Sequence, residues 1–127
     1  LASLSPEALD QYFATATLSR LTKRTICNET TLRQVLKNVR YRGWAFADQE
    51  SEDGVRTVAA PIVDRSRAVV AAINVSGHAA RVSMNELRRH YLPLVIDASR
   101  QISRALGGPI DVGPTYSTKN TSPRPRR

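Results

Sequence analysis

Apolar residues recur at the spacing of an amphipathic helix in two stretches in the first third of the chain. The first helix is predicted over residues 5 to about 16, because Ser5 can cap it and Pro6 suits its first position. The second is predicted to follow Asn28, another capping residue, and to end at Gly43. Their apolar positions are Leu9, Tyr12, Phe13 and Ala16 in the first and Leu32, Val35, Leu36 and Val39 in the second.

Three later runs have the composition of β-strands, at residues 44–47, 55–64 and 68–76. The last two runs are separated only by the Arg-Ser-Arg sequence at 65–67, a length that suits a β-hairpin. The hairpin makes these two strands antiparallel neighbours.

A last helix is predicted to begin at Ser83, which forms a capping box with Glu86, and to run as far as Gly107. Pro93 should kink or interrupt this helix, because proline has no backbone N–H to donate. Apolar residues recur at helical spacing on both sides of the proline: Leu87, Tyr91, Leu94, Ala98, Ala105 and Leu106. Residues 109–127 are rich in Pro, Ser, Thr and basic side chains and are predicted to form a disordered basic tail.

The two faces of the hairpin differ, since alternate side chains of a strand point to opposite faces of the sheet. Suited to packing against helices are Val58, Ala60 and Ile62 on the first strand and Val69, Ala71, Ile73 and Val75 on the second. The second face carries Val55, Thr57, Ala59, Pro61 and Val63, then Ala68, Val70, Ala72, Asn74 and Ser76. Thr57, Asn74 and Ser76 cluster at one end of it. Such a face is either a solvated surface or a cup in which a few hydrogen-bonding groups hold a ligand.

Length and composition indicate one domain without a membrane span. The 127 residues are 41% hydrophobic and 24% charged, and no apolar run approaches the ~20 residues that a bilayer span needs. A single cysteine excludes an internal disulfide, and the first residues lack the features of a signal peptide, so the cytoplasm is the expected compartment. The net charge of +8 comes with only 6% aromatic residues and no stacking motif, so this segment is not predicted to bind nucleic acid.

Catalytic and metal-binding chemistry find little support. Cys27 could act as a nucleophile with His78 or His90, but the spacing brings neither histidine near it, and packed thiols are commoner. The two histidines lack the spacing of a metal site, and the acidic residues within 48–53 lack that of a calcium loop. Neither a cofactor nor an enzyme activity is predicted.

Several motifs in order resemble the effector-binding domain of IclR-type bacterial transcriptional regulators. They are "GWAFADQESEDGVRTVAAPIVD" (43–64), "AAINVSGHAARVS" (71–83) and the helix end "ISRALGG" (102–108). The upstream stretch "TICNETTLRQVLKNVRYRGW" (25–44) is similar to the family's helix and the Gly-aromatic step that follows it. Details such as Asn74-Val75-Ser76 look most like the regulators of protocatechuate and p-hydroxybenzoate catabolism.

The resemblance implies an α+β, GAF-like domain over residues 1–108, with an antiparallel sheet and helices that hold a small organic acid in a cup. The chain would lack the opening strands of that domain and the N-terminal winged helix-turn-helix domain that contacts DNA. The family's pocket positions fall on Ala47, Val55, Thr57, Asn74 and Ser76, with Asp48 beside Ala47. Ala47 stands where the family often has an acidic residue and Thr57 where it commonly has cysteine.

Two classes of function follow from these expectations. The first is the ligand-sensing domain of a DNA-binding transcriptional regulator, which binds a small organic acid, the subgroup favouring an aromatic one, and forms a dimer or tetramer. The second is an oligomerisation domain without a small-molecule ligand. An enzyme is a distant third.

Overall fold

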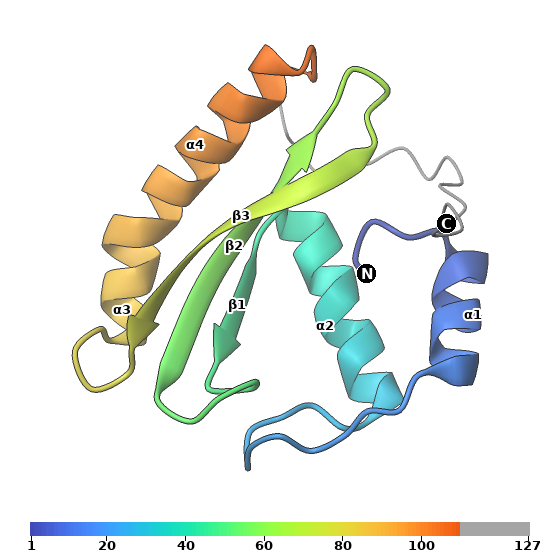
Figure 1. Ribbon diagram of the computed structural model, residues 1–127, viewed down its shortest axis with the longest axis vertical. Coiled ribbons are helices and arrows are strands. Elements are labelled where there is room, and N and C mark those ends of the chain that lie inside the picture. The colour runs from blue at the N-terminus through green and yellow to red at the C-terminus, as the bar shows by residue number, and fades with distance from the viewer. Residues whose placement is uncertain (110–127) are drawn as a thin grey trace, which may run out of the picture.

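The computed structural model describes residues 1–109, so the predicted tail lies outside the described residues except for Pro109. The elements in order are α1 (Pro6–Thr15), α2 (Glu29–Arg42), β1 (Ala45–Asp48), β2 (Val55–Val63), β3 (Val69–His78), α3 (Met84–Glu86), the π-helical turn η1 (Leu87–Tyr91) and α4 (Leu92–Ala105). The strands form one antiparallel sheet in the order β1-β2-β3 (Figure 1). The predicted α+β class is therefore confirmed.

Local signals place the helix ends where the sequence predicts them. The Ser5 hydroxyl accepts a hydrogen bond from the Ala8 N–H at 3.2 Å and caps α1. The Asn28 side chain caps α2 in the same way. Gly43 then ends α2 in the left-handed region, at φ 81°, which glycine adopts without steric cost.

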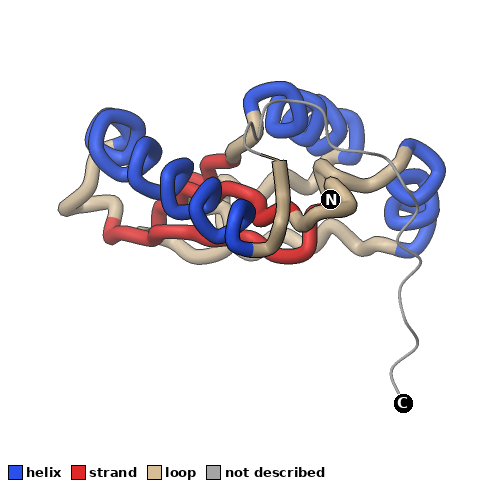
Figure 2. The backbone as a smooth tube through the Cα atoms, turned by 90° about the horizontal axis from the view of Figure 1, so that it is seen from above, coloured by secondary structure: helices blue, strands red, loops and turns tan. Residues whose placement is uncertain are grey.

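The core lies between the sheet and the C-terminal helices. Val58 and Ala60 on β2 are buried against Leu87 of η1 and Val95 of α4. This confirms the face that the alternation of β2 assigned to helix packing. Helix α4 lies on one side of the sheet, and α2 and α1 lie on the other (Figure 1). Seen from above, α1 is at the end of the molecule remote from α4 (Figure 2).

A β-bulge changes the face on which β3 begins. The register passes from Ile62–Ala71 directly to Val63–Val69, so the extra residue is Val70 of β3. The expectation that Val69 shares the helix-packing face with Ala71 is therefore wrong, because the extra residue of a bulge reverses the alternation of its own strand. Val69 instead lines a hollow together with Ala59 and Ala72 of the second face. Val63 is buried at 2% exposure, and its N–H donates to the Ser103 hydroxyl of α4 at 2.9 Å.

The interruption predicted at Pro93 takes the form of a π turn. The Leu92 N–H donates to the Leu87 carbonyl five residues earlier. The extra residue changes the helical phase, so Leu87 and Val95 share the core-facing side while Leu94 is 65% exposed. The apolar spacing seen in the sequence therefore does not form one continuous face.

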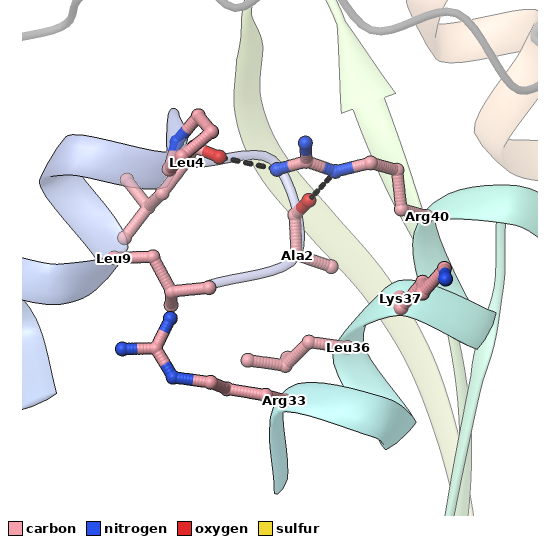
Figure 3. A pocket seen from close by; sticks show the side chains of 8 residues that line it. Ala2, Leu4, Leu9, Arg33, Leu36, Lys37 and Arg40 are labelled. Carbon is pink, nitrogen blue, oxygen red and sulfur yellow. Dashed lines mark hydrogen bonds between the residues drawn. The ribbon is translucent and has the colours of Figure 1, made fainter. Parts of the chain in front are cut away.

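The N-terminal segment docks on α2 through backbone carbonyls. The Arg40 guanidinium donates to the Ala2 carbonyl at 2.6 Å and to the Leu4 carbonyl (Figure 3). Asp10 of α1 pairs with Arg33 of α2 at 2.7 Å. These contacts enclose a hollow of about 180 Å³ between α1 and α2. Among residues 1–109, no helix is long and apolar enough to cross a membrane.

Candidate functional site

The side of the sheet that faces away from α4 carries most of the predicted pocket residues, and we call it the cup face. Antiparallel register arranges its side chains in rows across the strands. The rows are Ala47, Thr57 and Ser76, then Ala45, Ala59 and Asn74, then Pro61 and Ala72. The structure therefore brings Ala47 into one row with Ser76, which lies 29 positions later in the chain.

Polar side chains gather at one end of the cup face. The Thr57 and Ser76 hydroxyls lie directly across from each other and hydrogen-bond at 2.8 Å. Asn74 stands in the next row, beside Ala59. Thr57 is half-buried, whereas Asn74 and Ser76 are exposed and accessible to a ligand. Hydroxyl and amide groups can both donate to a carboxylate, so this end can bind an acid.

The other end of the cup face is apolar. A hollow of about 160 Å³ lies over it, and its floor includes Ala45, Ala59 and Ala72. Its walls come from the N-terminal segment, the end of α2 and the start of β1, and they include Leu1, Val39 and Trp44. Successive rows are ~6.6 Å apart, because two residues of a strand span that distance. The polar end and the hollow are thus close enough for one small molecule to touch both.

Two of the predicted pocket residues, Val55 and Asp48, do not line the hollow. Val55 shares the cup face but lies beyond Thr57, opposite His78, and so away from the hollow. Asp48 is paired with Arg56 in the register, on the face that carries Val58, so the expectation that it lines the pocket is corrected. It accepts a hydrogen bond from Arg56 Nε at 2.6 Å and also pairs with Arg24. The Arg56 hydrogen bond is the main reason that the pKa of Asp48 is below its ordinary value.

Arg56 is a structural residue that the sequence reasoning did not single out. Its Nη1 donates to the carbonyls of Ala79 at 3.2 Å and Val82 at 3.0 Å. Together with the Asp48 pair, these bonds tie the end of β1 to the loop that precedes α3. The sequence did contain a signal for this role, because Arg56 falls on the face of β2 that otherwise buries apolar side chains. A charge there needs partners.

The connector between α1 and α2, predicted only as polar, also holds the site in place. Thr22 is buried, and its hydroxyl donates to the Gln49 carbonyl at 2.6 Å. The Thr25 hydroxyl donates to the Glu50 carbonyl at the same distance. These bonds fix the loop that joins β1 to β2.

The part of the chain that the structure describes adds no support for catalysis by Cys27 or for a metal site. Cys27 is half-buried and donates to the Thr25 carbonyl at 3.5 Å. Within residues 1–109, no three His, Cys, Asp or Glu side chains gather closely enough to hold a metal ion.

Comparisons with known proteins agree on one family. Residues 1–104 match the family described as bacterial transcriptional regulator IclR C-terminal. The chain is 40% identical over 108 residues to the Pca regulon regulatory protein of Pseudomonas putida, covering 85% of this chain and 37% of that protein. It spans well under half the length of the curated relatives that it matches.

Solved structures show the same fold. The C-terminal domain of the Escherichia coli transcriptional regulator KdgR aligns with a TM-score of 0.77 at 32% identity, over 84% of this chain and 65% of that one. The inducer-binding domain of the PobR transcription factor from Acinetobacter, a double mutant in complex with 3-hydroxy benzoic acid, also aligns with a TM-score of 0.77. Its identity is 27%, over 80% of this chain and 58% of that one.

Proposed function

Because the chain belongs to the IclR family of bacterial transcriptional regulators, we propose that it is the effector-binding domain of such a regulator. Its effector is a small aromatic carboxylic acid that binds on the cup face. DNA is contacted by a part of the regulator outside this chain, so the effector acts on transcription through the rest of the protein.

The observation that carries this proposal is the change from polar to apolar along one sheet face. Thr57, Asn74 and Ser76 offer hydrogen bonds to a carboxylate at one end. The alanine floor admits a flat ring, since no side chain there extends beyond Cβ. The hollow over this floor accepts the ring. A benzoate reaches from one row to the next, given the ~6.6 Å spacing of rows.

The relatives support an aromatic effector. The inducer-binding domain of PobR was solved with 3-hydroxy benzoic acid, and it shares this fold at 27% identity. Transferred to this chain, that observation favours a hydroxylated benzoate over an aliphatic dicarboxylate. The apolar hollow favours it too, because a second carboxylate there would lose its hydration without gaining a partner.

A thermal-shift screen tests the proposal. Hydroxybenzoates and dihydroxybenzoates should raise the melting temperature by several degrees, whereas dicarboxylates and pyruvate should not. A hundredfold excess over Kd stabilises the folded state by ~2.7 kcal/mol. A domain of this size melts roughly 2–8 °C higher for each kcal/mol.

The matched variants are Asn74→Leu on the cup face and Asn38→Leu on α2, both at exposed positions. Asn74→Leu should abolish the shift and leave the unliganded melting temperature nearly unchanged, while Asn38→Leu should keep the shift. If no acid shifts the wild type, the alternative of an oligomerisation domain without a ligand is favoured. If Asn74→Leu unfolds the domain, Asn74 has a structural role.

A further inference from the structure

The hollow between α1 and α2 has an apolar lining of useful size. Its volume is about 180 Å³, and Leu9 of α1 and Leu36 of α2 point toward each other across it (Figure 3). Leu4 and Pro6 add to the apolar lining. An apolar cavity of about 150 Å³ is large enough to hold a benzene molecule. The hollow therefore has room for an apolar group of about that size.

Positive charge surrounds the same hollow. Within the described part of the chain, three basic side chains of α2 line it and no acidic one does: Arg33, Lys37 and Arg40. Arg33 is neutralised by two carboxylates. Among residues 1–109, Arg40 donates only to backbone carbonyls and Lys37 forms no ion pair. The charges of Lys37 and Arg40 are therefore not balanced by any carboxylate of residues 1–109.

We propose that this hollow is a second binding site, separate from the cup face, for a small carboxylate with an apolar body. The body packs between Leu9 and Leu36, where it loses contact with water. The carboxylate accepts charge-assisted hydrogen bonds from the Lys37 ammonium and from Nη1 of Arg40, since only Nε and Nη2 of that guanidinium have partners within residues 1–109. Both parts of the ligand are required for binding.

The N-terminal segment separates this hollow from the one on the cup face. Ala2 lines both of them. Leu9 and Leu36 line only the hollow between α1 and α2, whereas Ala59 and Ala72 line only the hollow on the cup face. The donors differ too, because the cup face offers hydroxyl and amide groups and this hollow offers an ammonium and a guanidinium. The second site therefore does not depend on the effector proposal.

An NMR titration of the whole chain with benzoate tests the second site. The Asn74→Leu background removes the amide of the cup face, so the two hollows are examined separately. The signals of Leu9 and Leu36 should shift and reach saturation. Benzyl alcohol lacks the charge and acetate lacks the ring, so each should bind roughly tenfold more weakly. Saturable shifts confined to Ala59 and Ala72, or benzyl alcohol that binds as tightly as benzoate, overturn the proposal.

A pair of charge reversals tests the role of Lys37. Lys37→Glu should raise the dissociation constant of benzoate, measured at Leu9 and Leu36, by roughly tenfold, because an attraction is replaced by a repulsion. Lys23→Glu is the matched control, since Lys23 is an exposed lysine of the α1–α2 connector and its reversal changes the net charge equally. It should leave the dissociation constant within about twofold of the parent value. Equal effects of the two reversals overturn the proposal.

A steric variant tests the place of the ligand. Leu9→Trp fills the hollow from α1, so the Leu36 signals should no longer respond to benzoate. Leu21→Trp is the control, because Leu21 is 68% exposed on the connector, and it should keep the response. A Leu36 response that persists in folded Leu9→Trp overturns the proposal. If Leu9→Trp does not fold, the charge reversals at two exposed lysines decide the outcome.

Discussion

Arg56 joins three segments that are distant along the chain, since its partners are Asp48, Ala79 and Val82. Its side chain is only 17% exposed, so the loss of the guanidinium leaves two carbonyls without this donor and removes one partner of the half-buried Asp48 carboxylate. The Arg56→Gln variant should lose about 1–3 kcal/mol of unfolding free energy, measured by urea denaturation. Arg81→Gln, at an exposed arginine in the adjacent loop, should change it by less than about 0.5 kcal/mol. Equal losses in both variants would argue against this role of Arg56.

Asp48 predicts a pH dependence of stability. Its pKa is lowered from the ordinary 3.8, mainly by the hydrogen bond from Arg56. A carboxyl with a lower pKa in the folded state stabilises the fold above its unfolded pKa, and this contribution is lost as pH falls through the folded pKa. The difference in unfolding free energy between wild type and Asp48→Asn should therefore be constant near neutral pH and shrink below about pH 4. A difference that stays constant down to pH 2 would contradict this assignment.

At the scale of elements, two serines of α4 hold the C-terminal end of β2. The Ser99 hydroxyl donates to the Pro61 carbonyl at 2.6 Å, and the Ser103 hydroxyl accepts from the Val63 N–H at 2.9 Å. The pairing of β2 with β1 ends at Ala59, so β1 offers no partner to these two backbone groups, and a buried group without a partner is costly. This explains why α4 buries serine on its sheet-facing side.

Ser103→Ala should therefore cost about 1–3 kcal/mol, because the buried Val63 N–H loses its acceptor. Ser19→Ala, at an exposed position in the α1–α2 connector, should stay within about 0.5 kcal/mol of wild type. Amide hydrogen exchange at Val63 should accelerate in Ser103→Ala, and an unchanged rate would show that the hydroxyl is dispensable.

At the scale of the whole molecule, the charge of each chain acts against association. Two chains of net charge +8 repel each other, and the Debye length falls from ~30 Å at 0.01 M salt to ~8 Å at 0.15 M. If apolar contacts drive the dimerisation expected from the sequence, the dissociation constant should fall by roughly tenfold over that range. Sedimentation equilibrium at several salt concentrations measures this. Weaker association with added salt would indicate that ion pairs, not apolar contacts, hold the dimer.

Much of the molecule could be predicted from local sequence alone. Ser5, Asn28 and Gly43 mark helix ends through contacts within a few residues, and each prediction is confirmed. The alternation of β2 correctly assigned Val58 and Ala60 to the core. The motif resemblance to IclR-type regulators, near those of protocatechuate catabolism, is confirmed by the family match and by the Pca relatives.

Strand alternation was sufficient to predict which polar residues of the candidate site share a face. Thr57, Asn74 and Ser76 share a face because alternation and one hairpin connection bring them together. Asp48 was misplaced because the resemblance only set it next to Ala47, and neighbours along a strand point to opposite faces. That the site residues bind an effector stays a prediction.

The sequence by itself determined the elements, their caps, the hairpin and the family, because these depend on residues close together in the chain or on motifs read in order. Tertiary structure alone decided where the alternation breaks and where the helical phase shifts. The alternation of β3 breaks at Val70, because the pairing of β3 with β2 skips that residue. The π turn before Pro93 aligns Leu87 with Val95 and turns Leu94 outward, because packing on β2 selects one helical phase. The periodic pattern of apolar residues in the sequence shows no change at the bulge or at the π turn.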